Sequence, residues 1–189
     1  MSSASREREM KWITRNHVHV DRVACPWLIH RFIDQEAKFD FIPWPGPVPD
    51  ATEGILFDFP DLDIPFTHHD GKCTFEVLID HYELEDPVLL EMTKVIHGAD
   101  VVRDLDLVPE SRGVELTLSG VSFLSDDDHQ AIQKGFIICD SIYAGLLLRM
   151  LGTQMQGELE GKSREEAFRL LHAELKRHLP PTIKVGPMI

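Results

Sequence analysis

The stretch that decides the fold is KWITRNHVHVDRVACPWLIHRFIDQEAKFDFIP, residues 11–43. Its beginning, Lys11–Arg15, is a short strand candidate, and Phe39–Pro43 is a second one. The apolar residues between them recur at the i, i+4 spacing of a helix, namely Val23, Ala24, Trp27, Leu28 and Phe32. A strand, a helix and a strand in this order predict a β-α-β unit with parallel strands.

Two positions are possible for the start of this helix. Asp21 can cap a helix, since its short side chain accepts hydrogen bonds from free N–H groups. Pro26 then falls just after the first turn and removes a backbone hydrogen bond. Alternatively, the helix starts near Cys25 with Pro26 at its first position, where a missing N–H costs nothing.

Further along the chain, the prolines separate a few more extended segments. Residues 44–50 (WPGPVPD) contain three prolines and a glycine and predict a loop. The mostly apolar residues 54–59 predict a third strand inside the sheet. Residues 64–69 predict a short edge strand, because Pro65 cannot donate a ladder hydrogen bond.

The remainder of the chain has helical signals. We expect four more helices, over residues 75–82, 86–98, 130–151 and 163–175, with Gly98 as the stop of the second and a Ser-x-x-Glu capping box opening the last. The predicted class is therefore α+β: a small N-terminal sheet with a β-α-β start, followed by a mainly helical remainder. We expect residues 1–151 to form one domain. Residues 152–189 then form a linker and an amphipathic C-terminal helix, which packs back on the domain or covers a second copy in a homodimer.

Composition narrows the function classes. The chain has 189 residues, of which 43% are hydrophobic and 27% charged, as in ordinary globular proteins. Its net charge of −13 disfavours binding to nucleic acid or to anionic membranes. Three dispersed cysteines without a Cys-x-x-Cys pair, a polar start and no uninterrupted membrane-length apolar run predict a cytoplasmic protein.

The negative charge is concentrated in the middle of the chain. Residues 50–110 contain sixteen acidic groups and only three basic ones, whereas the flanking parts are nearly neutral. Such a segment is either a solvated acidic face, which keeps the protein dispersed, or a cation site.

One group of residues in this segment has the chemistry of a metal site: Asp58, His68, His69, Cys73 and Glu76. A strand end, a loop and the first turn of a helix can bring these side chains together, and imidazole with carboxylate suits manganese, iron or zinc. In a continued strand His68 and His69 would point in opposite directions, so only one would face the site. Glu76 is also explained by the preference of any helix start for an acid.

Two further sets of residues are candidates. His129 and Asp140 lie on one face of the 130–151 helix, with Tyr143 near the same stripe. They either bond a neighbouring helix, or His129 is a metal ligand while Asp140, Tyr143 and Cys73 support the ligands. Arg15 and Arg22 are candidates for binding an oxyanion, since a guanidinium group matches such ligands geometrically.

A longer pattern resembles a known family. The string Asp21-Arg-Val-Ala-Cys-Pro-Trp-Leu-Ile29, with the motifs at 11–15 and 31–34, is similar to the C-terminal domain of the chromate-resistance protein B family. Further matches are Phe57-Asp58, His68-His69, Cys73–Glu76, Gly98–Asp100, Asp140 and Tyr143. The resemblance covers residues 11–145 and implies the handling of an oxyanion or of its redox consequences.

Two functions remain open from the sequence. The first is a sensor or binding domain in the response to chromate and oxidative stress, in which arginines near Arg22 meet an oxyanion, together with a bound divalent metal. The second is a metal-dependent redox or hydrolytic enzyme that uses a cation held by histidine, glutamate and aspartate. Expected partners are thus a metal ion or a small oxyanion.

Overall fold

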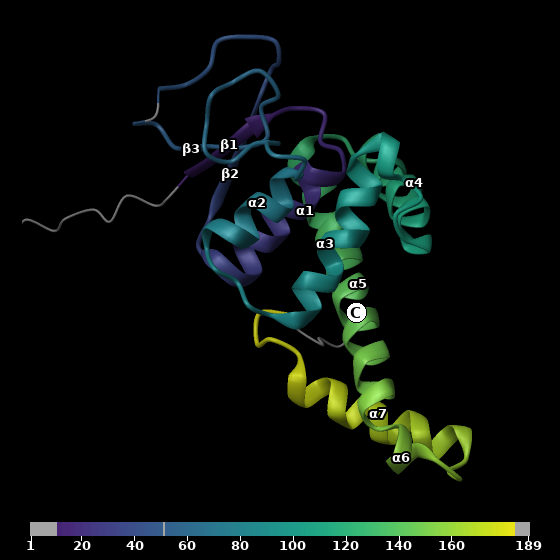
Figure 1. The fold of residues 1–189 in the computed structure, drawn as a ribbon. Helices are drawn as coiled ribbons and strands as arrows, with labels where there is room; N and C mark the ends of the chain where they lie inside the picture. The colour runs from purple at the N-terminus through teal and green to yellow at the C-terminus, as the bar shows by residue number, and fades with distance from the viewer. Residues whose placement is uncertain (1–10, 51, 184–189) are drawn as a thin grey trace, which may run out of the picture.

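The computed structural model describes residues 11–50 and 52–183 and confirms the α+β class (Figure 1). Strand β1 (Lys11–Arg15) pairs in parallel with β2 (Lys38–Ile42) on one side and with β3 (Ile55–Leu56) on the other. The described residues contain seven α-helices: α1 (Val20–Leu28), α2 (Thr74–His81), α3 (Pro87–Asp100), α4 (Pro109–Phe123), α5 (Asp128–Gln154), α6 (Gln156–Leu159) and α7 (Arg164–His178). The predicted β-α-β unit with parallel strands is therefore confirmed.

The third strand differs from the prediction. β3 has only two residues and lies at an edge, because the sheet order is β2-β1-β3 and β1 is central. The strand ends early because Asp58 adopts a left-handed backbone with φ of 54°. Over residues 64–69, all of which are described, an isolated bridge between Phe57 and Phe66 replaces the predicted edge strand.

Helix α1 begins at neither of the two predicted positions. It begins at Val20, before Asp21, and contains Pro26 in its interior, so a start near Cys25 is wrong. The helix continues into a π-helical turn, Ile29–Ile33, in which the Asp34 N–H donates to the Ile29 carbonyl at 2.7 Å. Every α1 residue except Arg22 is buried, and this burial outweighs the local cost of the proline.

Helix α4 has no clear signal in the sequence and was not predicted. Its glycines and exposed polar residues dilute the apolar periodicity, and only Ser111, Val114 and Leu118 are buried. Gly98 also has another role than a helix stop, because α3 continues to Asp100. A Cβ at Gly98 would lie 2.4 Å from Ser111 Oγ, so this glycine lets α3 and α4 approach closely.

The C-terminal helices extend along α5. The predicted linker, residues 152–162, contains the end of α5 and the short α6, whereas the capping box at the start of α7 is confirmed. In Figure 1, α7 (yellow) crosses the end of α5 that lies far from the sheet. By length and mean hydropathy, 1.5 over an 18-residue window, α5 could cross a membrane. Five other helices, α1, α3, α4, α6 and α7, contact it.

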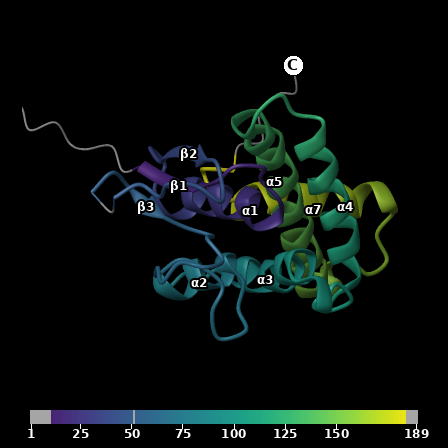
Figure 2. The same cartoon turned by 90° about the horizontal axis from the view of Figure 1, so that it is seen from above.

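Helix α1 connects the layers of the fold. Seen from above, it lies beside the sheet and between α5 and the layer of α2 and α3 (Figure 2). Its Trp27 is fully buried and packs against Phe75 of α2 and Tyr143 of α5. This packing brings the first turn of α1, the start of α2 and the end of α3 to one place.

The contact of α1 with α5 depends on a glycine. A Cβ at Gly135 would lie 2.1 Å from Val23 Cγ1, and neither helix can move without opening the core. We expect Gly135→Ala to lower the free energy of unfolding by about 1–3 kcal/mol in urea denaturation. The control is Gly145→Ala in the same helix, where the added methyl meets no atom within 4 Å and the change should be neutral or stabilising. Equal effects of the two substitutions would contradict the close approach.

Candidate metal centre

Three side chains with metal-binding atoms meet between α1, α3 and the loop before α2. The Nε2 atom of His68 lies 3.2 Å from Asp21 Oδ2 and 3.1 Å from Asp100 Oδ2. One donor atom from each residue lies within 4.8 Å of the others. We call Asp21, His68 and Asp100 the acidic triad.

Asp21 is the most enclosed member of the acidic triad. Its side chain is 1% exposed, and its Oδ2 accepts hydrogen bonds from the backbone N–H groups of Thr74 at 2.6 Å and of Phe75 at 3.4 Å. It therefore caps α2 across the fold, where the helix dipole favours a negative charge, instead of capping its own helix. Its other oxygen, Oδ1, is buried and has no hydrogen-bond partner among the described residues.

The charges of the acidic triad are strongly coupled. Hydrogen bonds to Asp100 and Asp21 raise the pKa of His68 to about 10. Burial, followed by the charge of Asp100, raises the pKa of Asp21. Burial alone would also raise the pKa of Asp100, but the hydrogen bond and charge of His68 outweigh it and lower this pKa. Without a metal, the protonated imidazole of His68 is the cation between the carboxylates.

Asp58 lies beside the acidic triad and is neutralised by two arginines. Its Oδ2 accepts hydrogen bonds from Arg22 Nη1 at 2.8 Å and from Arg15 Nη2 at 3.4 Å. Its Oδ1 accepts a hydrogen bond from the Thr74 hydroxyl at 3.0 Å and lies 3.6 Å from His68 Nε2. Asp58 is thus a neighbour of the predicted site, and Arg15 and Arg22 bind this carboxylate.

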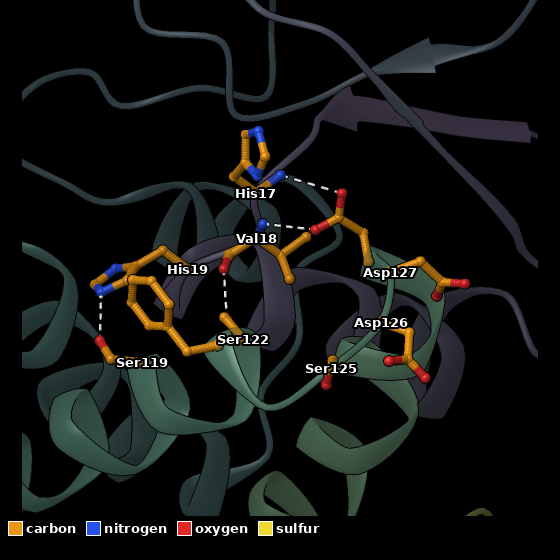
Figure 3. A pocket seen from close by; sticks show the side chains of 10 residues that line it. His17, Val18, His19, Ser119, Ser122, Ser125, Asp126 and Asp127 are labelled. Carbon is orange, nitrogen blue, oxygen red and sulfur yellow. Dashed lines mark hydrogen bonds between the residues drawn. The ribbon is translucent and has the colours of Figure 1, made fainter.

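A small cavity borders the acidic triad and shares His19 with a larger cavity beside it. A cavity of about 350 Å³ is lined by His68, Asp100, Asp58, both arginines, His19 and Pro60. Figure 3 shows the neighbouring, larger cavity, of about 560 Å³, between the loop before α1 and the turn from α4 to α5. There His19 Nε2 lies 2.8 Å from Ser119 Oγ, and the Ser122 hydroxyl donates to the Val18 carbonyl at 2.6 Å. The larger cavity thus lies between two segments of the fold. The smaller cavity is the one that is lined by His68 and Asp100 of the acidic triad.

A second cluster lies at the start of α2. The sulfur of Cys73, one carboxylate oxygen of Glu76 and one ring nitrogen of His97 lie within 4.8 Å of one another. Glu76 Oε2 is 2.5 Å from His97 Nδ1, and His97 Nε2 is 3.1 Å from Asp104 Oδ2. Burial would lower the pKa of His97, but its hydrogen bonds to the two carboxylates outweigh it and raise this pKa.

Two predicted ligands lie apart from both clusters. The side chain of His69 is 50% exposed, and its Nδ1 lies 3.3 Å from Asp70 Oδ2. Of the two histidines, His68 belongs to the acidic triad and His69 does not, although both line a cavity of about 430 Å³. The ring of His129 packs edge-on against Phe41 of β2, with 5.0 Å between the ring centroids.

Asp140 and Tyr143 bond neighbouring helices, the simpler of the two alternatives considered for them. Asp140 accepts hydrogen bonds from Trp27 Nε1 at 2.7 Å and from the Arg31 guanidinium at 3.0 and 2.9 Å. The Tyr143 hydroxyl donates to Asp86 Oδ2 at 2.8 Å. Asp86 in turn caps α3, so these bonds connect α5 with the helices around it.

Sequence reasoning missed three members of the clusters: Asp21, Asp100 and His97. Asp21 was assigned to the start of its own helix, where a short acidic residue is ordinary. His97 and Asp100 both lie in the last turn of α3, but they join different clusters. The available signal for Asp100 was its place in the stretch Gly98–Asp100, which matches the family pattern.

Comparisons with known proteins agree with the resemblance. The family model "ChrB, C-terminal domain" matches residues 12–146, which include both clusters. Protein ChrB of Cupriavidus metallidurans is 38% identical over 135 residues, which make up 70% of this chain and 40% of that protein. The match thus spans less than half the length of this curated relative, and no solved structure matches. Because the family model covers well over half of the residues, the chain belongs to the ChrB C-terminal domain family.

Proposed function

We propose that this domain serves chromate resistance, which its family implies, by binding a divalent metal ion in the acidic triad. The observation that carries the proposal is the meeting of His68 Nε2 with Asp21 Oδ2 and Asp100 Oδ2, at a buried Asp21 carboxylate whose Oδ1 also has no partner among the described residues. A buried charge requires a partner. A metal ion would neutralise both carboxylates and accept the lone pair of a neutral His68.

The donor set limits the choice of metal. Two carboxylates and one imidazole combine hard ligands with one of intermediate character, which suits manganese, iron or zinc. Three protein ligands leave further coordination positions, and these would face the cavity of about 350 Å³. A water molecule or a small oxyanion fits such a position.

The surroundings favour a metal, rather than the arginines, as the group that meets an oxyanion. Arg15 and Arg22 each donate to Asp58, so both guanidinium groups are already held by a carboxylate. Free chromate would also approach the carboxylates of the acidic triad, which repel it. Sensing of an oxyanion by this domain therefore depends on the bound metal. The open coordination positions also support the second candidate, a metal-dependent enzyme with a redox or hydrolytic reaction.

Metal analysis of the untagged protein tests the proposal. We expect near-stoichiometric manganese, iron or zinc after purification without added metal. His68→Ala and Asp100→Asn should each weaken the affinity at the acidic triad by about 100-fold or more, since each removes a direct ligand. His69→Ala is the matched control, because it removes the adjacent, exposed imidazole and should leave the affinity unchanged. Full metal binding by both His68→Ala and Asp100→Asn would contradict the proposal.

A chromate titration distinguishes binding of an oxyanion by the metal from binding by the arginines. Metal-loaded protein should bind chromate, whereas protein stripped with a chelator should not. Binding of equal strength to the stripped protein, lost in Arg22→Ala, would instead support the arginines as the anion site. Turnover of a redox or ester substrate only by the loaded protein would favour the enzyme.

A further inference from the structure

The cluster of Cys73, Glu76 and His97 has its own metal-binding geometry. We propose that these three residues form a second metal site, separate from the acidic triad, which binds a thiophilic divalent ion such as Zn²⁺ through one thiolate, one carboxylate and one imidazole. No residue is shared between the two sites. This inference does not depend on a metal in the acidic triad.

The fold holds the three ligands rigidly. Cys73 is the residue before the first turn of α2, Glu76 lies in that turn, and His97 lies in the last turn of α3, which packs on α2. Glu76 Oε2 accepts a hydrogen bond from the Cys73 backbone N–H at 2.9 Å, and this bond fixes the carboxylate between the sulfur and the imidazole. The side chains of Cys73 and His97 are largely buried, so few other positions are open to them.

A second carboxylate orients the imidazole. His97 Nε2 faces Asp104 Oδ2 at 3.1 Å, while Nδ1 faces Glu76 and Cys73. When Nε2–H donates to Asp104, the lone pair of Nδ1 points into the cluster. Metal-ligating histidines commonly donate their second ring N–H to a carboxylate in this way. Asp104 is therefore a positioning residue for the proposed site.

The thiol of Cys73 can serve as a ligand only in its deprotonated form. Burial, and next the charge of Asp21, raises the pKa of this thiol, so the metal-free protein keeps the proton. A divalent ion would displace it: the S–H bond breaks, the proton goes to water, and a metal–sulfur bond forms. The resulting ion, thiolate and carboxylate together carry no net charge, which suits a buried site. The backbone N–H of Glu76 at the helix start points towards the sulfur and further favours the thiolate.

The donor sets distinguish the two sites chemically. The acidic triad offers two carboxylates and an imidazole, whereas the second cluster replaces one carboxylate with sulfur. Thiolate ligands favour zinc over manganese, because manganese prefers oxygen donors. Manganese should therefore load the acidic triad only, and zinc should load both sites.

Zinc and cobalt titrations of the full chain test the inference. We expect two equivalents of Zn²⁺ per chain and, with Co²⁺ as the probe, a thiolate-to-cobalt charge-transfer absorption. Cys73→Ala should remove this absorption and one equivalent of zinc. The control is Cys139→Ala, which removes a buried cysteine from α5 and should leave both unchanged. A charge-transfer absorption that persists in Cys73→Ala would overturn the inference.

Two further variants separate a loss of zinc at the second site from misfolding and from a loss of metal at the acidic triad. Asp104→Asn alters a half-buried residue without changing its size and should weaken zinc at the second site by roughly 10–100-fold. Unchanged zinc affinity in this variant would exclude the orienting role of Asp104. His68→Ala should keep the charge-transfer absorption. If the protein bound one zinc ion, lost in His68→Ala and kept in Cys73→Ala, the second site alone would be refuted. If that one ion were instead lost in Cys73→Ala and kept in His68→Ala, the metal in the acidic triad would be refuted.

Discussion

Asp58→Ala is expected to lower the free energy of unfolding by about 3–5 kcal/mol, with or without metal. Asp58 is 4% exposed and receives hydrogen bonds from Arg22, Arg15 and the Thr74 hydroxyl. Removing its carboxylate leaves the Arg22 guanidinium, 11% exposed, without its acidic partner in the fold. Loss of one member of a buried ion pair is costly because the other charge stays buried.

Urea denaturation with and without a chelator measures this effect. The control is Asp106→Ala, which breaks a two-bond pair with Arg112 on the surface, where the aspartate side chain is 78% exposed. That change should cost far less stability than Asp58→Ala, because solvent screens the pair. If Asp58→Ala kept the free energy of unfolding unchanged in the chelator and abolished metal binding, the main role of Asp58 would be that of a metal ligand, as predicted from the sequence.

The sequence predicted the fold well where local and tertiary signals agree. The parallel β-α-β start and α7 follow from apolar periodicity and from a capping box, which act within a few residues. The interior position of Pro26 and the two-residue length of β3 could not be predicted in this way. Both depend on burial of α1 among α2, α3 and α5, and on contacts that join distant parts of the chain.

The candidate site, too, could be predicted only where its residues lie close together in the sequence. His68, Cys73 and Glu76 could be chosen from their residue types and proximity in the sequence. Asp21 and Asp100 join His68 from positions 47 residues before and 32 residues after it, and no pattern within one segment links them. The single predicted cluster thus becomes two, because α2 places Cys73 and Glu76 towards α3 and leaves His68 with the start of α1.

Metal should invert the pH dependence of stability. In the metal-free protein the folded-state pKa of His68 is about 10, above its ordinary 6.5. The stability that His68 contributes through its raised pKa is therefore fully present below pH 6.5 and is lost as the pH rises to about 10. The side chain is 41% exposed, so we expect a screened loss of about 1–2 kcal/mol over this window. The raised pKa of Asp21 acts in the same direction, since the folded state holds its proton more tightly than the unfolded chain.

The bound metal reverses this trend because it competes with protons for the same ligands. Its binding strengthens as His68 and Asp21 lose their protons, and metal at a hundredfold excess over its dissociation constant adds about 2.7 kcal/mol. The melting temperature should thus fall with rising pH in a chelator and rise with pH in manganese. His68→Gln should flatten both curves, whereas His69→Gln should leave both slopes in place, since His69 lies outside the acidic triad and its Nδ1 faces Asp70 at the surface. Identical slopes with and without manganese in the unsubstituted protein would show that no proton of the acidic triad is exchanged for a metal ion.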